Sequence, residues 1–302
     1  MLALLQRGAT LGLLALAMLW AAYCWHRAEP AWALYGTGFL LTAHAWLLAC
    51  EFLWMAHVNK ADAAPHATAV DSLAAWWGEV LSAPHVFCWL QPFRSQRWPD
   101  YLPPSTRGCR GVLLVHGFVC NRGLWNPWLK RLRAQRVPYA AINLEPVFGS
   151  IEDYCALIEQ GVASLERATG MAPIVVAHSM GGLAVRHWWA NNGERARVHH
   201  AITIGTPHHG TRLARFALSP NARQMRRDSR WLRRLQIRES THLPNHAAHF
   251  TCYYSHCDNI VFPASSATLA GADNRHLPAV AHVRMCSRDE PFDELMRLLS
   301  RR

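Results

Sequence analysis

The chain has 302 residues, of which 51% are apolar and 17% are charged, a composition that excludes a disordered chain and allows a sizeable core. The net charge is +11, and all but two of the 31 basic residues are arginine, which favours anionic partners such as lipid headgroups or nucleic acid. Nine cysteines form an odd set without paired metal-ligand spacing. We therefore expect neither a zinc site nor a full disulfide framework.

Apolar residues crowd the first 58 positions. The 19 residues between Arg7 and Arg27, and the 21 between Glu29 and Glu51, carry no formal charge, and each run is long enough to cross a bilayer core as a helix. Tryptophan and tyrosine residues cluster around the short link between the two runs, at residues 27–29, as they do at a headgroup boundary. We predict a transmembrane helical hairpin over 1–58. A cleaved signal peptide is the alternative for the first run, but it does not explain the second.

The orientation of such a hairpin decides the compartment of the rest of the chain. Arg7, the amino terminus and Lys60 lie on one side and Arg27 on the other, which favours both ends in the cytoplasm. The unpaired cysteines agree with a reducing compartment. His44 falls in the middle of the second span, where we expect it to face the partner helix. If the second run were instead a helix buried in the globular domain, a single span would place that domain outside.

The remaining sequence predicts an α/β domain. Residues 59–109 are rich in proline and tryptophan and predict a linker with one helix over 70–83, leading into the first strands. From residue 110, short apolar runs alternate with helical patterns, which is typical of a parallel sheet covered by helices. We expect strands at 111–117, 138–144, 172–178, 199–206, 249–255 and near 275–280, and helices at 124–135, 151–170, 180–192 and 291–302.

The run IVVAHSMGG predicts a strand that ends at Ser179 and a helix that begins at Met180. A serine at such a sharp turn exposes its hydroxyl, with the positive end of the helix behind it. The small residues Ala177 and Gly181, two before and two after the serine, let the turn close. The pattern is AxSxG rather than GxSxG. Ser179 is thus a candidate nucleophile, and the alternative is that it merely caps the helix.

Two further motifs follow expected strands. His116-Gly117-Phe118 ends the first strand of the α/β domain, and the backbone amides of Phe118 and Met180 are candidates to hold a developing oxyanion. We take His116 and Gly117 as candidate substrate-binding residues, the alternative being an ordinary glycine between strand and loop. The third motif is TIGTPHHGT at residues 203–211, again at the end of a strand.

A serine nucleophile needs a histidine to take its proton and an acid to orient that histidine. Asp258 follows the strand expected at 249–255, and His282 is expected at the end of the last strand, just before the closing helix. This gives the order serine, aspartate, histidine. His276 is the rival base, and Asp273 is the weaker candidate for the acid.

Taken together and in this order, the motifs VHGF, AHSMGG and GTPHHGT with the late Asp258 and His282 resemble the α/β-hydrolase family, within it the bacterial lipase-like branch, over about residues 110–302. The AHSMG form is similar to that of small Bacillus-type lipases. The resemblance implies ester hydrolysis through an acyl-enzyme, with Ser179 as nucleophile, His282 as base and then acid, and Asp258 as its orienter. No cofactor is expected, and the structural calcium of some larger lipases is not carried over because no metal-ligand cluster is recognisable.

Between residues 210 and 245, nine arginines stand against two acids, with apolar residues interleaved. The position matches the place where these hydrolases insert a cap, so we predict a cap or lid over about 210–245 of the catalytic domain. It is either a lid that faces an anionic membrane or a solvated helix. Nucleic-acid binding is less favoured because no recognition motif accompanies the charge.

The sequence as a whole predicts a membrane-anchored serine carboxylesterase or lipase that acts on acyl esters at the bilayer. We expect it in the bacterial inner membrane, with the catalytic domain on the cytoplasmic side. The alternative from another class is a catalytically silent hydrolase fold that serves as a membrane scaffold or transporter accessory. An acyltransferase or thioesterase also stays open, since the choice of acceptor depends on pocket shape and water exclusion.

Overall fold

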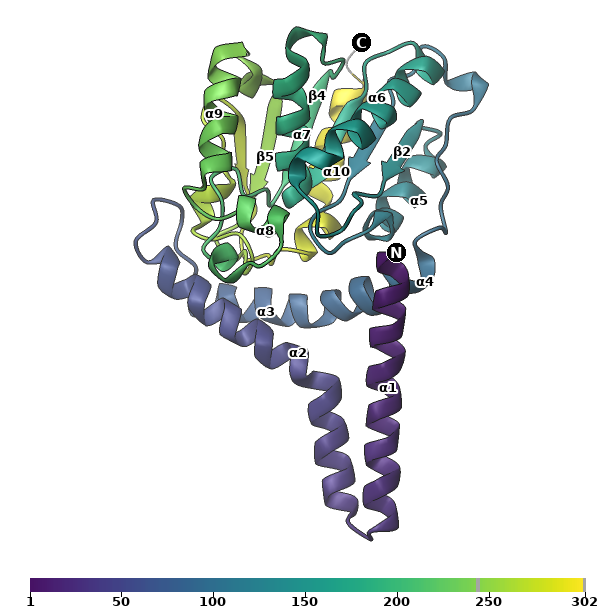
Figure 1. The fold of residues 1–302 in the computed structure, drawn as a ribbon, viewed down its shortest axis with the longest axis vertical. Helices are drawn as coiled ribbons and strands as arrows, with labels where there is room; N and C mark the ends of the chain where they lie inside the picture. Colours follow the sequence, from purple (N-terminus) through teal and green to yellow (C-terminus); the bar gives the residue numbers. More distant parts are fainter. Residues whose placement is uncertain (243–244, 301–302) are drawn as a thin grey trace.

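The computed structural model describes residues 1–242 and 245–300 and places a six-stranded parallel sheet above a group of N-terminal helices (Figure 1). The strand order is β2-β1-β3-β4-β5-β6. The strands are β1 Val112–Val115, β2 Tyr139–Ile142, β3 Ile174–His178, β4 His200–Ile204, β5 Phe250–Tyr254 and β6 Asp273–His276. The first five lie within the expected ranges, whereas β6 begins and ends earlier than expected.

Helices cover both faces of the sheet, as the alternating pattern predicts. Successive residues of β1 point to opposite sides: Leu113 and Val115 belong to a core with α6 and α7, and Val112 and Leu114 to a core with α5 and α10. The covering helices are α5 Asn126–Ala134, α6 Cys155–Thr169, α7 Met180–Asn192, α9 Arg230–His242 and α10 Asp289–Ser300, with the short α8 Pro220–Gln224 before α9. The last two residues of the expected closing helix, 301–302, lie outside the described residues, as do 243–244 of the expected cap.

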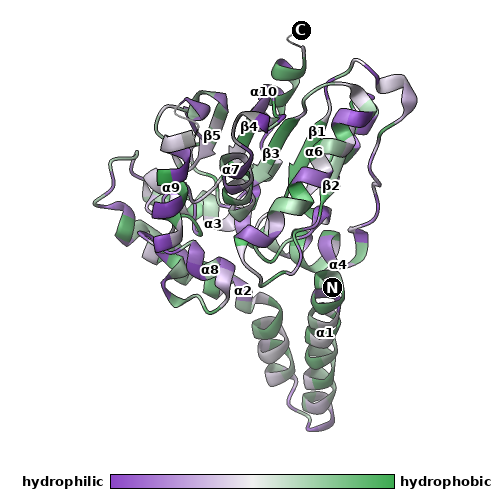
Figure 2. Ribbon diagram, turned by 45° about the horizontal axis from the view of Figure 1, so that its top comes forward, coloured by the Kyte–Doolittle hydropathy of each residue, from purple (hydrophilic) through white to green (hydrophobic). Residues whose placement is uncertain are grey.

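The N-terminal hairpin is formed by α1 (Leu2–His26) and α2 (Pro30–Asn59), which lie antiparallel and are apolar along most of their length (Figures 1 and 2). Both are long and apolar enough to be candidate membrane spans, and only 11% of the most apolar window of each is buried. This low burial contradicts the alternative in which the second run is a core helix. The helices pack closely where the Trp20 indole donates to the carbonyl of Trp32 (2.9 Å).

Both ends of the hairpin return to the sheet domain. The amino group of Met1, at the start of α1, lies 3.1 Å from the carboxylate of Glu145. At the end of α2, the side-chain amide of Asn59 donates to the backbone carbonyl of His256 (3.1 Å). The expectation for His44 is wrong, because its ring donates to the carbonyl of Val80 (3.1 Å) rather than facing α1. The second half of α2 therefore packs under the sheet domain.

The segment 59–109 was expected to be a linker with one helix over 70–83 and the first strands; that helix is present as α3, and further helix takes the place of the strands. Helix α3 (Ala69–Pro84) continues through a π-helical stretch (His85–Leu90) into α4 (Gln91–Arg94), so that 69–94 form one helical rod. Pro84 is the last residue of α3, directly before the wider π-helical stretch, and Pro92 is the second residue of α4, directly after it, so both prolines, which lack a backbone N–H, lie where the helix type changes. The expected strands are absent from 59–109 as described, except for an isolated bridge between Tyr101 and Tyr139.

Candidate functional site

Ser179 lies at a strained turn between β3 and α7. Its φ of 54° and ψ of −130° are unusual for a residue with a side chain, and such strain gathers at functional sites. The turn is held because the Ser179 amide donates to the carbonyl of Ile204 (2.9 Å). A Cβ at Gly181 would lie 2.5 Å from the carbonyl oxygen of His116, so this position must stay small for the turn to pack against the loop after β1.

The structure brings Asp258 and His282 together. His282 Nδ1 donates to Asp258 Oδ2 (2.9 Å), and Asp258 Oδ1 accepts hydrogen bonds from the amides of Ile260 (2.9 Å) and Val261 (2.8 Å). The acid is thus fixed in the loop after β5. The expectation that His282 lies at a strand end is wrong, because β6 ends at His276 and His282 sits in the loop that follows.

The surrounding charges favour a protonated His282. Burial alone would lower its pKa, but the charge and hydrogen bond of Asp258, together with the more distant carboxylates of Glu79 and Glu51, raise this pKa above its ordinary value. Such an imidazole can hold a proton taken from a neighbouring hydroxyl, which is what a general base requires.

The rival residues lie elsewhere. His276 pairs its Nε2 with His256 Nδ1 (2.9 Å), and Asp273 is half exposed beside Arg275. Neither lines the cavity that contains Ser179 and His282. The geometry therefore agrees with the choice of Asp258 and His282 over His276 and Asp273.

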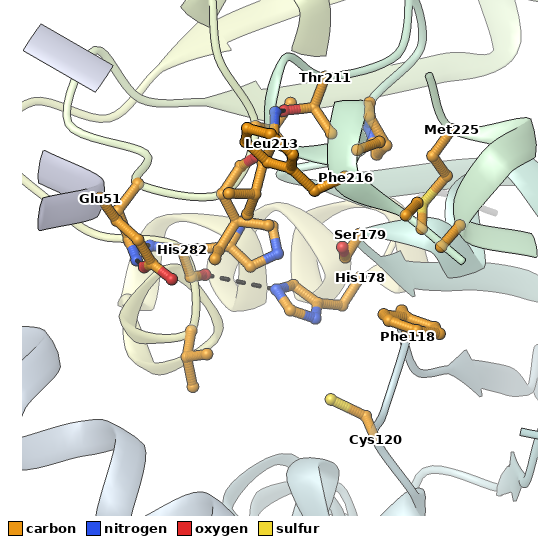
Figure 3. A pocket seen from close by; sticks show the side chains of 18 of the residues that line it. Glu51, Phe118, Cys120, His178, Ser179, Thr211, Leu213, Phe216, Met225 and His282 are labelled. Carbon is orange, nitrogen blue, oxygen red and sulfur yellow. Dashed lines mark hydrogen bonds between the residues drawn. The ribbon is translucent and has the colours of Figure 1, made fainter. Parts of the chain in front are cut away.

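Ser179 and His282 share the wall of a cavity of about 790 Å3 (Figure 3), within the range of small-molecule sites. Large apolar side chains from the loops at the carboxyl edge of the sheet line much of it: Phe118, Phe148, Leu213, Phe216, Leu218 and Met225. Of the expected cap over 210–245, only the part from Thr211 to Met225 lines the cavity. Helix α9 instead packs on α7, away from the hairpin (Figure 1).

The two amides expected at the oxyanion position come from different elements, the loop after β1 and the start of α7. Met180 is the first residue of α7, and Phe118 lines the cavity. Neither amide donates a hydrogen bond to another group in the part of the chain that the structure describes. Both are therefore available to a negatively charged oxygen formed next to the serine.

His116 and Gly117 lie outside the cavity lining, contrary to the expectation that they contact substrate. His116 Nε2 accepts a hydrogen bond from the Leu144 amide (3.0 Å), and its Nδ1 donates to the carbonyl of Gly117 (2.9 Å). Burial lowers the pKa of His116 to about 4, so the ring stays neutral. A Cβ at Gly117 would lie 2.7 Å from that of Ser179. Both residues shape the loop that supports the serine.

Comparison with solved structures identifies the architecture. The chain is similar to the mature form of Bacillus licheniformis lipase BlEst2 (18% identity, TM-score 0.56, covering 64% of this chain and 92% of that one). It is also similar to Aspergillus fumigatus lipase B (21% identity, TM-score 0.52, covering 67% of this chain and 59% of that one). The chain has the α/β-hydrolase fold. The sequence matches no protein-family model and no curated protein.

The N-terminal helices add a carboxylate to this α/β-hydrolase domain that the sequence reasoning missed. Glu79 of α3 is buried, lines the cavity, and accepts hydrogen bonds from the amides of Val283 (3.0 Å) and Arg284 (3.2 Å). Burial raises the pKa of Glu79 to about 7, against the lowering effect of these bonds. A signal was present, because Glu79 is the only formal charge between Asp71 and Arg94.

A second carboxylate from the hairpin reaches the same loops. Glu51 of α2 lines the cavity and accepts a hydrogen bond from the side-chain amide of Asn259 (2.7 Å), whose oxygen accepts the backbone amide of His282 (3.3 Å). The loop with the acid and the loop with the histidine are thus both tied to helices outside the sheet domain.

His178, directly before the serine, packs against His282 with ring centroids 4.6 Å apart. Its Nε2 donates to the carbonyl of His282 (3.3 Å; Figure 3). Burial, and to a lesser degree the charge of His282, hold the pKa of His178 well below its ordinary value. The neutral ring therefore supports the backbone of His282 and does not compete for protons.

The third motif forms a buried polar network beside the site. Arg186 of α7 donates to both carboxylate oxygens of Glu239 in α9 (2.8 and 2.6 Å) and to the carbonyl of His208 (3.0 Å). His208 in turn lies 3.1 Å from the hydroxyl of Thr203. This network attaches α9 to the sheet. Among the described residues, no group of three or more His, Cys, Asp or Glu side chains is placed to hold a metal.

Proposed function

We propose that the protein is a membrane-anchored serine carboxylesterase or lipase. One observation carries the proposal: Ser179, on a strained turn, shares a cavity wall with His282, whose Nδ1 is hydrogen-bonded to the fixed carboxylate of Asp258. Nucleophile, base and orienter in this arrangement are the parts that acyl transfer through a serine requires.

In the first half of the reaction, Ser179 Oγ forms a bond to the carbonyl carbon of the ester while its proton passes to Nε2 of His282. The carbonyl oxygen becomes an oxyanion, which the amides of Phe118 and Met180 stabilise. Asp258 holds Nδ1–H of the imidazolium and stabilises its charge. The bond between carbon and the alcohol oxygen then breaks, and the proton on Nε2 moves to the departing alcohol.

In the second half, a water molecule attacks the acyl-serine while His282 takes one of its protons. The ester bond to Ser179 breaks, Oγ regains a proton from His282, and the carboxylic acid leaves. The same groups thus act in both directions, and no oxidant, reductant or cofactor is needed.

Several findings support the choice of ester and the anchoring. Two solved structures of similar fold carry the name lipase, and apolar side chains surround the nucleophile, as an acyl chain requires. Helices α1 and α2 are candidate spans whose two ends both return to the sheet domain. The charge distribution favours the cytoplasmic side of a bacterial inner membrane.

The test is covalent labelling with a fluorophosphonate, followed by peptide mapping, together with hydrolysis of p-nitrophenyl esters. We expect the label on Ser179, and we expect Ser179→Ala to lose both labelling and several powers of ten in rate while its melting temperature stays close to that of the parent. Full activity in Ser179→Ala, or a parent that neither labels nor hydrolyses any ester, would contradict the proposal.

A further inference from the structure

The outer face of the helical rod 69–94 is apolar and exposed. Five large side chains recur along it at helical spacing and are between 47% and 77% exposed. We call them the docking face: Val70, Leu73, Trp77, Leu81 and Trp89. The opposite face is buried and carries Glu79, so no formal charge interrupts the docking face between Asp71 and Arg94. A continuous apolar surface of this kind marks an interaction site.

The rod is fixed to both candidate spans, at the middle of α2 and near the start of α1. The Trp76 indole donates to the carbonyl of Ala45 in α2 (3.0 Å), and Arg7 of α1 donates to the carbonyl of Pro92 (2.9 Å). Figure 1 shows α3 lying across the top of the hairpin, beneath the sheet domain. The docking face therefore continues the apolar surface of α1 and α2 at the level where a bilayer would end.

The composition of the rod fits a membrane interface. Tryptophan is enriched at the boundary between headgroups and acyl chains, and amphipathic helices bury their apolar face there. Arg94 lies over the ring of Trp89, 5.0 Å from its centroid, and Arg7 over that of Phe93 at 5.3 Å. These guanidinium groups at one end of the rod are placed to meet lipid phosphates.

The N-terminal helices also form part of the wall of the cavity that contains Ser179. Its wall includes Leu48 of α2 and Phe87 of the rod, and it extends to Phe216 and Leu218, which are exposed. The Phe216 ring packs against Trp54 of α2 with centroids 5.7 Å apart. The cavity is thus bordered partly by the helices that the bilayer would surround.

We propose that the docking face lies in the headgroup boundary of the leaflet next to the sheet domain, and that the substrate is a lipid ester drawn from that leaflet. This inference rests on the proposed function. The occupant of the docking face is the phospholipid bilayer, because the face is continuous with the candidate spans. A second copy of the chain is the competing occupant, and the experiment distinguishes the two.

The first experiment locates the face directly and does not depend on activity. Benzoylphenylalanine replaces Trp77 or Leu81 in the full chain, reconstituted in vesicles of phosphatidylcholine and phosphatidylglycerol. The control position is Ile237, which is 66% exposed on α9, away from the hairpin. We expect phospholipid adducts at 77 and 81 at least tenfold above those at 237. Equal adducts at all three positions, or crosslinks from 77 to a second chain, would overturn the proposal.

The second experiment tests substrate delivery. The variant L73S/W77S/L81S and the control I237S are compared on p-nitrophenyl acetate in solution and on a long-chain ester carried in the same vesicles. We expect the triple variant to keep its rate on the soluble ester within about twofold and to lose at least tenfold on the vesicle ester, with the control unchanged on both.

The two experiments separate the possible failures. If the rate of the triple variant fell equally on both esters, the docking face would have no role in delivering substrate. The substitutions would then act only by disturbing the structure of the site. If the parent hydrolyses neither ester, the proposed function fails, whereas the crosslinking result still decides whether the rod lies in the membrane.

Discussion

The sheet domain and the N-terminal helices contribute differently to one candidate site. The sheet domain supplies the proposed nucleophile, acid and base: Ser179 after β3, Asp258 after β5 and His282 after β6. Helices α2 and α3 supply Glu51 and Glu79, which are connected to the loops of the acid and the histidine. The solved lipases of similar fold cover 64% and 67% of the chain, about the length of the sheet domain.

This difference indicates a site completed by its anchor. The apolar contacts agree with the polar ones, because Phe52 and Met55 of α2 form a cluster with Phe262 and Ala281 from the two loops. An anchor that only tethered the domain would need no such contacts. We therefore expect the geometry of the candidate site to depend on the position of α2 and α3.

The largest expected effect tests the sheet domain. His282→Ala removes the proposed base and should lower kcat/KM for a p-nitrophenyl ester by more than about a thousandfold. His276→Ala is the matched control, because this histidine pairs with His256 outside the cavity, and it should stay within about threefold of the parent. The reverse ranking in steady-state assays would show that the loop after β6 has been assigned the wrong base.

The next effect tests the helices. Glu79→Ala leaves the amides of Val283 and Arg284 without this acceptor, at about 1–3 kcal/mol for the buried amide of Val283. We expect kcat to fall about 10- to 100-fold with KM less affected, because the loop of His282 loses its support. Glu79→Gln keeps one acceptor oxygen and should recover part of the loss. An unchanged kcat in Glu79→Ala would reduce the helices to a simple tether.

The same position has a pH signature that packing alone would not produce. The negative charges of Asp258, Glu79 and Glu51 raise the pKa of His282, and the neighbouring His178 stays neutral. Because the base must be unprotonated, the rate rises as pH passes this pKa. Removing one negative charge in Glu79→Gln should move this acidic limb of the kcat/KM profile to lower pH. A limb that stays in place would contradict an electrostatic role for Glu79.

The sequence made it possible to name the proposed catalytic residues, but not the residues that support them. Ser179 could be found because strand, turn and helix are local, and Asp258 because it follows a recognisable strand. The partners of Glu79 are more than 200 positions away along the chain, at Val283 and Arg284, and no local pattern reveals such a pairing. The helix predicted over 70–83 includes Glu79, but the prolines that follow it were interpreted as breaking regular structure, so the continuation of the rod to Arg94 was missed.

The candidate substrate-binding residues failed for a related reason. A histidine at a strand end can face a ligand or bond its own backbone, and residue type alone does not distinguish the two. In the structure both ring nitrogens of His116 are used by the chain itself. The first part of the expected cap lines the cavity, whereas its arginine-rich helix lies on α7, where the buried pair of Arg186 and Glu239 holds it.

A smaller effect concerns stability. The pKa of Glu79 is raised to about 7 in the folded protein from an ordinary value of 4.5, so the folded state binds more protons than the unfolded state between these pH values. Its contribution to stability is therefore lost as pH rises through this window, by up to about 3 kcal/mol. Thermal unfolding at pH 5 and pH 8 should show that the free energy of unfolding falls less between these pH values for Glu79→Gln than for the parent. Parallel losses would mean that the carboxyl group titrates normally.

The smallest expected effect concerns the arginines of α9, for which the sequence left two alternatives open, a lid that faces an anionic membrane and a solvated helix. Arg230, Arg233 and Arg234 belong to a helix that lines no part of the cavity and lies on the side away from the hairpin (Figure 1). Replacing all three by Gln should change hydrolysis of a vesicle-borne ester by less than about twofold, because none touches the catalytic groups and the screened attraction of a surface charge fades within about 10 Å. Arg226 is left intact in this variant, since it donates to the carbonyls of Ala214 and Ala217 beside the cavity. If the triple variant instead lost activity on anionic vesicles and kept it on neutral ones, α9 would be a second membrane contact, and the anchor could no longer be assigned to the N-terminal helices alone.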